Sequence, residues 1–203
     1  MPVMSSVERA FCRSHPWRYV AERHVLPWAL DGDRLIGRVL EIGGGTGAMA
    51  QAMARRFPEA TITVTDVDDV MVRAASQQLR PVANVSVERA DVTRLPYGSS
   101  TFDAVTSYLM LHHVVEWEDA LAEVARVLRP GGVLIGYDLT DTKLARLVHQ
   151  LDGSPHRIIA PVDLSRGLGV AGLTEGMVRL SARGHLMRFR SAKVDSASPG
   201  SRG

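Results

Sequence analysis

The feature that most constrains the fold is a short apolar stretch that leads directly into glycines and then into a helix. Residues 38–45 are RVLEIGGG, and residues 46–57 are TGAMAQAMARRF, which place Ala50, Met53 and Phe57 on one helical face. An apolar run of this kind is typical of a strand–turn–helix unit. Because glycines let backbone approach closely and a helix start offers free N–H groups, the turn predicts a ligand site.

Strand and helix patterns then alternate along the chain. Further strands are predicted at 60–66, 84–91, 102–109 and 132–138, and helices at 68–79 and 117–128, with an RPGG turn after the second helix. Repeated strand–helix units with short connections predict a parallel sheet that is covered by helices on both faces. We therefore expect an α/β, Rossmann-like three-layer sandwich.

Near the C-terminus the pattern changes to period-two alternation. Residues 176–182 and 185–191 alternate in this way on either side of Arg183-Gly184, which predicts an antiparallel hairpin at the sheet edge. Before the hairpin we expect a helix at 141–151 and a loop over 156–173. Residues 194–203, VDSASPGSRG, are predicted to be a disordered tail.

The segment before the glycine turn is predicted to be helical. Residues 7–30 have apolar residues at helical spacing, and Pro16 and Pro27 are expected to break them into two short helices. Its aromatic residues form either a lid over a site or anchors that hold the segment to the sheet; they are Trp17, Tyr19 and Trp28. The expected organisation is a helical lid or cap at 1–37, one domain at 38–193 and the tail at 194–203.

Length and composition narrow the class of protein. A chain of 203 residues suits one well-buried α/β domain, and its single cysteine, Cys12, argues against a disulfide framework or a thiolate zinc site. The N-terminus lacks the basic-then-apolar pattern of a signal peptide, and no window contains 18 consecutive apolar residues. We therefore expect a soluble, cytoplasmic protein without a membrane span.

Charge is unevenly distributed, although the net charge is only +2. Residues 66–142 contain 12 Asp/Glu and 6 Arg, whereas residues 143–203 contain 10 Lys/Arg and 4 Asp/Glu. The basic C-terminal third suits an anionic partner, or more simply a solvated arginine-rich surface. Because aromatic residues do not interleave with these cations as a stacking platform requires, the sequence argues against nucleic acid as a partner.

Carboxylates follow three consecutive predicted strands. Glu41 ends the first strand, Asp66 the second and Asp91 the third. A carboxylate beside the glycine turn suits a cationic ligand better than a pyrophosphate, whereas Asp66 is placed to accept hydrogen bonds from ribose hydroxyls in many nucleotide-binding folds. A single Asp after a strand is more often a helix N-cap, the role expected for Asp68 and Asp69. Together the acids predict a crevice for a cationic nucleoside.

Several segments resemble class I S-adenosylmethionine-dependent methyltransferases. VLEIGGGTG is similar to the family's first motif, and TVTDVDDVMVRAA is similar to its second-strand acidic motif. ADVTRLPYGSSTFDAVTSYLMLHHV and EVARVLRPGGVLIGYD resemble the segments around the fourth and fifth strands. The resemblance covers roughly residues 38–138, and it is closest to small-molecule methyltransferases that include the quinone C-methyltransferases.

The resemblance implies a sheet of seven strands, mostly parallel with the last one antiparallel, and a set of S-adenosylmethionine-binding residues. The glycine turn and Glu41 would hold the methionine end, Asp66 and Val67 the ribose and adenine, and Asp91 and Val92 the adenine edge. The chain from Ser107 to His112 would line the methionine side. The turn's glycines are Gly43, Gly44, Gly45 and Gly47.

The methyl acceptor is predicted to be a small molecule. SYLMLHH stands where DNA adenine and glutamine-amide methyltransferases have N/D-P-P-Y/F, which argues against methylation of those nitrogens. No cysteine lies nearby, which argues against thiolate-based base methylation. If the acceptor must lose a proton, His112 and His113 are the candidate catalytic bases; otherwise His112 packs on the cofactor and His113 caps the next loop. His156 and Arg157 are candidates for the pocket wall, and the histidine spacing predicts no metal.

Two other functions stay open on the sequence alone. The first is a cofactor-binding or partner-regulating protein that keeps the fold without turnover. The second is a nicotinamide-dependent oxidoreductase, because Gly45, Gly47 and Ala50 also fit G-x-G-x-x-G/A. Glu41, Asp91 and the lack of a Tyr-x-x-x-Lys pair argue against the oxidoreductase.

Overall fold

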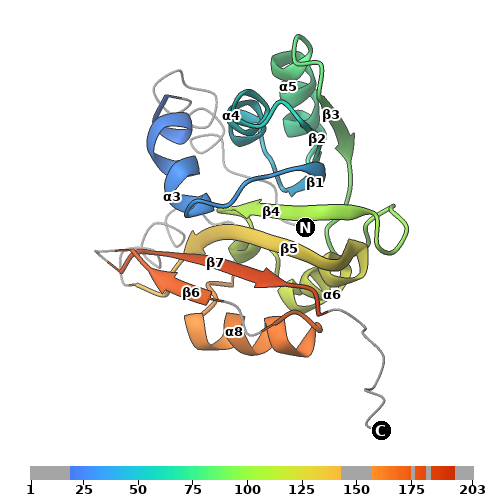
Figure 1. The fold of residues 1–203 in the computed structure, drawn as a ribbon. Coiled ribbons are helices and arrows are strands. Elements are labelled where there is room, and N and C mark those ends of the chain that lie inside the picture. The colour runs from blue at the N-terminus through green and yellow to red at the C-terminus, as the bar shows by residue number, and fades with distance from the viewer. Residues whose placement is uncertain (1–18, 143–156, 175–176, 182–183, 195–203) are drawn as a thin grey trace, which may run out of the picture.

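Seven strands form one sheet in the order β3-β2-β1-β4-β5-β7-β6 in the computed structural model, which describes residues 19–142, 157–174, 177–181 and 184–194 (Figure 1). Strands β1 to β5 pair in parallel, and β7 pairs antiparallel with both β5 and β6. The expected mixed sheet and C-terminal hairpin are therefore confirmed. The strands are β1 (Gly37–Ile42), β2 (Ala60–Asp66), β3 (Val85–Arg89), β4 (Phe102–Tyr108), β5 (Leu128–Leu139), β6 (Met177–Leu180) and β7 (Leu186–Ala192).

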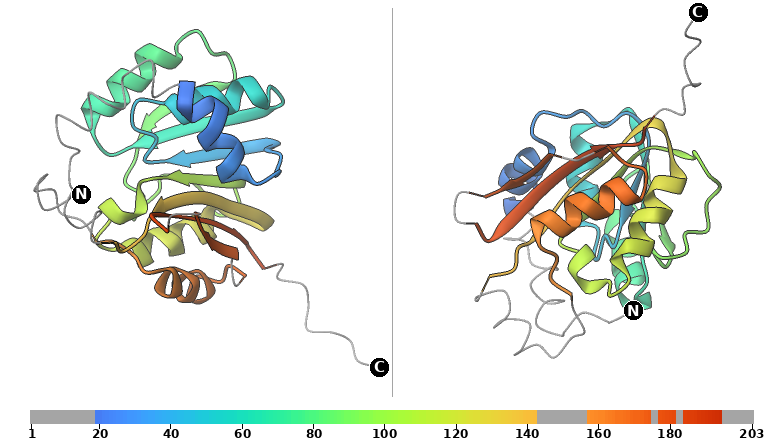
Figure 2. Two further views of the ribbon diagram at one scale, coloured as in Figure 1. Left: turned by 90° about the vertical axis from the view of Figure 1, so that its left-hand side faces the viewer. Right: turned by 90° about the horizontal axis from the view of Figure 1, so that it is seen from below.

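Helices cover both faces of this sheet and give it three layers. One face carries η1 (Ala21–Val25), α3 (Leu26–Leu30), α4 (Ala48–Arg56) and α5 (Asp69–Leu79). The other face carries α6 (Trp117–Val127) and α8 (Pro161–Val170), which contact each other (Figure 2). A single turn, η2 (Leu111–His113), follows β4. All described helices are too short or too polar to cross a bilayer.

The central strand β1 shows why these apolar runs are strands. Successive side chains on a strand point to opposite faces, so a strand between two helical layers has to be apolar on both. Val39 packs in the core beneath α4, Leu40 packs in the core beneath α6, and both are fully buried. Burial on both faces holds β1 at the centre and its carboxyl end at the glycine turn.

The expected helix break at Pro27 is wrong. The described chain stays helical from residue 19 to 30, with the five-residue turn of η1 just before the proline. There the Leu26 N–H bonds the carbonyl of Ala21, five residues back, which widens the helix. A wider turn relieves the clash of a proline ring with the carbonyl four residues earlier, so the helix continues. Pro16 and Trp17 lie outside the described residues.

Trp28 anchors this N-terminal segment to the sheet. Its ring packs edge-on against Tyr137 of β5 with centroids 5.6 Å apart, and the Arg188 guanidinium lies 6.0 Å from its ring centroid. Tyr19, by contrast, is 62% exposed. These contacts favour the anchor interpretation for Trp28, and a lid role for residues 1–37 stays a prediction.

A helix, α8, replaces most of the loop expected over residues 156–173. Leu164 and Leu168 are fully buried one turn apart, as an amphipathic helix requires. Two glycines, Gly167 and Gly169, lie within this helix. Gly167 serves packing, because a Cβ built there would lie only 2.4 Å from a Trp117 ring atom.

The segment after α6 also differs from the expected turn. The predicted RPGG turn at 129–132 belongs to β5, whose pairing shifts between Phe102↔Leu128 and Ala104↔Val133, so the extra residues form an irregularity within the strand. The helix expected at 141–151 and the tail at 194–203 lie almost entirely outside the described residues.

Candidate functional site

The glycine turn joins β1 to α4 and is shaped for close approach. Gly45 has a φ of 56°, a conformation that side chains disfavour, and no heavy atom lies within 4 Å of a Cβ built on it. Gly43 has a φ of 61°, and Met110 packs so closely that a built Cβ would lie 1.9 Å from its Cγ. The backbone of the turn is therefore open to a ligand at Gly45, whereas at Gly43 it packs against Met110.

Asp66 at the end of β2 holds this turn in place. Its carboxylate accepts hydrogen bonds from the backbone N–H groups of Gly45 and Asp68, each at 2.9 Å. Burial raises the pKa of the Asp66 carboxyl, and the two N–H donors oppose the shift. Because a carboxylate can accept about four hydrogen bonds, Asp66 keeps acceptor capacity for a ligand.

The two acids after Asp66 do not share one role. The Asp68 side chain accepts from the Val70 N–H at 2.8 Å and caps α5, as predicted. The cap expected of Asp69 is wrong: its carboxylate lies 3.2 Å from the Arg89 guanidinium in a surface pair. Asp69 therefore contributes to the N-terminal turn of α5 only through its charge.

A cavity of about 550 Å³, counting its open mouth, lies beside this turn. The cavity lies at the carboxyl ends of β1, β2 and β4, where the strand order reverses between β1 and β4. Its lining residues are Gly43, Thr65, Asp66, Val67, Ala90, Val92, Leu109, Met110, His113 and Val114.

Glu41 lies beneath the turn and does not line the cavity. The side chain is 1% exposed, and its Oε2 has no hydrogen-bond partner among the described residues. A Cβ built on Gly44 would lie 3.2 Å from the Glu41 carboxyl carbon, so the turn passes directly over this group. Burial raises the pKa of the Glu41 carboxyl to about 8, and the nearby Asp66 charge adds to the shift.

The segment after β3 places Val92, but not Asp91, on the cavity. β3 ends at Arg89, so Asp91 is not the end of the strand as expected. Its Oδ1 accepts hydrogen bonds from the Thr93 N–H at 2.9 Å and the Thr93 hydroxyl at 2.7 Å, which fixes a turn. Asp91 therefore shapes the wall through this turn, and Ala90 and Val92 line it.

The two histidines after β4 face different surroundings. His113 lines the cavity, whereas His112 is 3% exposed and bonded to Asp138 at the end of β5. Asp138 accepts from both the His112 backbone N–H, at 3.1 Å, and its Nδ1, while the Arg157 N–H donates to the His112 carbonyl. The ring centroids of His112 and His113 lie 4.0 Å apart. The alternative role of His113, a cap of the next loop, stays a prediction beside its place on the cavity.

Sequence reasoning missed Asp138 and several apolar lining residues. Asp138 ends a predicted strand that is the parallel neighbour of the strand before His112, and that adjacency was the available signal.

The remaining predicted site residues lie away from the cavity or outside the described chain. Ser107 is fully buried, and its hydroxyl has no partner among the described residues. Arg157 bonds the Val115 carbonyl and pairs with Glu118 at 2.9 Å, so its side chain is held on the surface. His156 lies outside the described residues.

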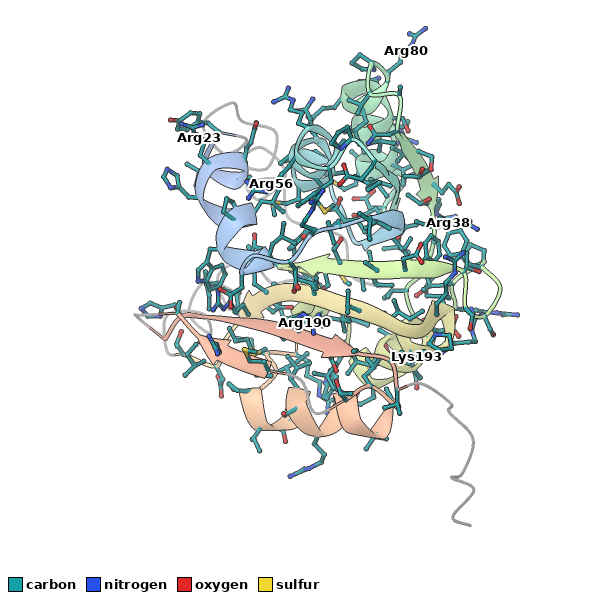
Figure 3. All side chains as sticks on the ribbon, in the orientation of Figure 1. Arg23, Arg38, Arg56, Arg80, Arg190 and Lys193 are labelled. Atoms are coloured by element: carbon teal, nitrogen blue, oxygen red, sulfur yellow. The ribbon has the colours of Figure 1, made fainter. Side chains whose placement is uncertain are left out.

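The basic C-terminal third does not form a free cationic patch in the described part of the chain. Each of its described cations has a carboxylate or carbonyl partner: Arg157, Arg166, Arg179, Arg188, Arg190 and Lys193. The cations labelled in Figure 3 are spread over several elements of the molecule. The simpler interpretation, a paired and solvated surface, is the one that these contacts support. No group of three or more His, Cys, Asp or Glu in the described ranges is suited to hold a metal ion.

Comparison with known proteins adds an independent line of evidence. Residues 40–136 match a family model described as "Methyltransferase domain". A ubiquinone/menaquinone biosynthesis C-methyltransferase from Desulfotalea psychrophila is 36% identical over 109 residues, 54% of this chain and 44% of the relative. Another of the same name, from Azotobacter vinelandii, is 38% identical over 110 residues, 52% of this chain and 44% of the relative. The chain thus spans less than half the length of these curated relatives.

Solved structures share the fold over most of the chain. A SAM-dependent methyltransferase from Aquifex aeolicus superposes with a TM-score of 0.75 at 18% identity, covering 93% of this chain and 98% of the other. The [4+2]-cyclase SpnF superposes with a TM-score of 0.73 at 21% identity, covering 91% and 85%. At these identities the similarity shows the fold alone.

Proposed function

We propose that this chain, which carries a class I methyltransferase domain, transfers a methyl group from S-adenosylmethionine to a small-molecule acceptor. The match of residues 40–136 to the family model supports the reaction and the cosubstrate. The structural observation that carries the proposal is the cavity at the strand-order reversal, bounded by Gly43, Asp66, Val67 and Val92. Ligands of open α/β sheets bind in this place.

The residues present fit S-adenosylmethionine. Asp66 has acceptor capacity left for ribose hydroxyls, and Val67 and Val92 offer apolar contacts to an adenine ring. Two buried polar atoms without a partner in the described chain, Glu41 Oε2 and the Ser107 hydroxyl, lie on the strands that lead into the site. A buried polar group is costly unless it is bonded, so these atoms support a polar ligand group there. The remaining contacts would come from Gly43, Gly44, Gly45 and Gly47.

Glu41 also separates this ligand from a dinucleotide. A carboxyl group directly beneath the turn suits a ligand that brings positive charge, such as an ammonium. A pyrophosphate at the same turn would be repelled by that group once ionised. This geometry supports the methyltransferase proposal over a nicotinamide-dependent oxidoreductase.

The cofactor supplies an activated methyl group, which leaves positioning and proton transfer to the protein. Leu109, Met110 and Val114 make an apolar wall that excludes water from the acceptor side. His113 is the imidazole on that wall, and in this proposal it takes the proton that an acceptor loses. His112 and Asp138 hold the turn that carries His113.

A hydroxylated quinone precursor is the first acceptor to test. The relatives at 36% and 38% identity are named as C-methyltransferases of ubiquinone and menaquinone biosynthesis. The apolar wall of the cavity suits an aromatic acceptor. The acceptor, like the predicted cytoplasmic location, is a proposal.

Titration calorimetry with S-adenosylhomocysteine tests cofactor binding without an acceptor. We expect micromolar affinity, and we expect Asp66→Ala to weaken binding by roughly 1–3 kcal/mol because a buried hydrogen-bond partner is lost. Asp69→Ala is the matched control, since that carboxylate is in a surface pair. Binding of NAD in place of S-adenosylhomocysteine would contradict the proposal.

A second candidate function is cofactor binding without methyl transfer. The likeness to SpnF, a [4+2]-cyclase by name, favours keeping it, because the same fold is present in a protein named for another reaction. Radiolabelled S-adenosylmethionine and a panel of quinols, phenols and amines distinguish the two. Tight cofactor binding with no label transferred to any acceptor would favour the second candidate.

A further inference from the structure

Glu41 is a buried carboxyl group whose contacts are incomplete. It is 1% exposed, its Oε2 has no partner in the described chain, and the backbone of the glycine turn lies over it. Burying a carboxylate without a counter-charge is costly, and a group in this position keeps its proton instead. The proposed functions of the site do not explain a carboxyl group held in this state.

The groups that face Glu41 come from three neighbouring elements. Asp66 on β2 and the buried Tyr108 on β4 both interact with it electrostatically, and the backbone N–H of Ala50 on α4 donates a hydrogen bond. Among the described residues, no Lys, Arg or His forms an ion pair with it. Burial, with a second acid nearby and only one N–H donor to oppose it, raises the pKa of Glu41 to about 8, so the carboxyl is protonated at pH 7.

We propose that cofactor binding drives a proton off Glu41, so that recognition of the ligand's amino-acid end releases a proton to solvent. This inference rests on the proposed function. In the step, the O–H bond of the Glu41 carboxyl breaks, the proton passes to buffer, and the carboxylate gains the ligand ammonium, bound over the glycine turn, as its counter-charge. The ammonium supplies the cation that the described protein around Glu41 does not.

Calorimetry in two buffers of different ionisation enthalpy, phosphate and Tris, measures the protons released. At pH 7 about nine in ten Glu41 side chains carry the proton, so S-adenosylhomocysteine is expected to release close to one proton per site. The association constant should then rise roughly tenfold from pH 6.5 to 7.5. 5′-Methylthioadenosine, which has the same nucleoside and thioether but no amino-acid end, should release almost none.

Two variants test whether the released proton comes from Glu41. Glu41→Gln keeps the size of the side chain but cannot ionise, so proton release with S-adenosylhomocysteine should disappear and the pH dependence of binding should flatten. Glu59→Gln, which changes an exposed glutamate paired with Arg34, should behave as the wild type.

The outcomes separate this inference from the proposed function. If S-adenosylhomocysteine binds with the same enthalpy in both buffers, or if 5′-methylthioadenosine releases as many protons, the coupling to Glu41 is wrong and the methyltransferase proposal stands. If S-adenosylhomocysteine does not bind at all, both are wrong. The wild-type comparison of the two ligands carries the test even if Glu41→Gln fails to fold.

Discussion

Glu41 and Asp66 lie at the carboxyl ends of neighbouring parallel strands, yet their surroundings differ. Asp66 accepts two backbone N–H bonds at 2.9 Å and is partly open to the cavity, whereas Glu41 is closed off beneath Gly44. Burial therefore raises the pKa of the Glu41 carboxyl to about 8, because few hydrogen-bond donors oppose the shift. The cost of this arrangement should be measurable in the protein without ligand.

Glu41→Gln should stabilise the unliganded protein at high pH. Native Glu41 keeps its proton to about pH 8, whereas the unfolded side chain loses it near 4.5, so the free energy of unfolding falls as pH rises between these values. Glutamine stays neutral, and we expect a gain on the order of 4 kcal/mol at pH 8 and little change at pH 4.5. Urea unfolding at several pH values measures this.

Glu59→Gln is the control for that measurement. The free energy of unfolding of this variant should differ from that of the wild type by a nearly constant amount between pH 5.5 and 8, because Glu59 is on the surface. A pH-independent effect of Glu41→Gln would show that the buried carboxyl is already ionised in the folded protein.

The sequence predicted some site residues better than others for a physical reason. The glycine turn and Asp66 could be predicted because each lies at the carboxyl end of a strand-like segment, and parallel register brings such positions together. His112 and His113 are adjacent in sequence, so no local pattern shows which one faces the cavity. Asp138, 26 positions after His112, bonds both the backbone and the ring of His112. This contact buries His112 and leaves His113 on the cavity.

Among the elements, strands and the helices between them were predictable, and α8 was not. Strand β2 is rich in β-branched residues, and β1 and β5 contain short apolar runs, as parallel pairing between helical layers favours. The two glycines in α8 lower its intrinsic helix propensity. Contact with Trp117 of α6, which the local sequence does not show, explains why Gly167 occurs within a helix.

Paired substitutions in α8 test this explanation. Gly167→Ala should destabilise the protein by roughly 1–3 kcal/mol, because the methyl group would meet the Trp117 ring at 2.4 Å. Gly169→Ala should stabilise it by roughly 0.5–1 kcal/mol, because no atom lies within 4 Å and alanine favours the helix. Thermal or urea unfolding of both variants measures the contrast. Equal effects would mean that Trp117 does not constrain Gly167.

At the scale of the whole molecule, the cavity is a consequence of topology. The sheet order reverses between β1 and β4, so the connections after these strands diverge to opposite faces and leave a crevice. Separate apolar cores on the two faces hold the strands in register around it. Residues far apart in sequence, such as Gly43, Asp66 and His113, therefore line one cavity.

A structure determined with S-adenosylhomocysteine bound tests the central claim most directly. We predict the ribose within hydrogen-bonding distance of Asp66, the adenine between Val67 and Val92, and the amino-acid end over the turn from Gly43 to Gly47. A ligand bound elsewhere, or one whose amino-acid end points away from that turn, would contradict the claim.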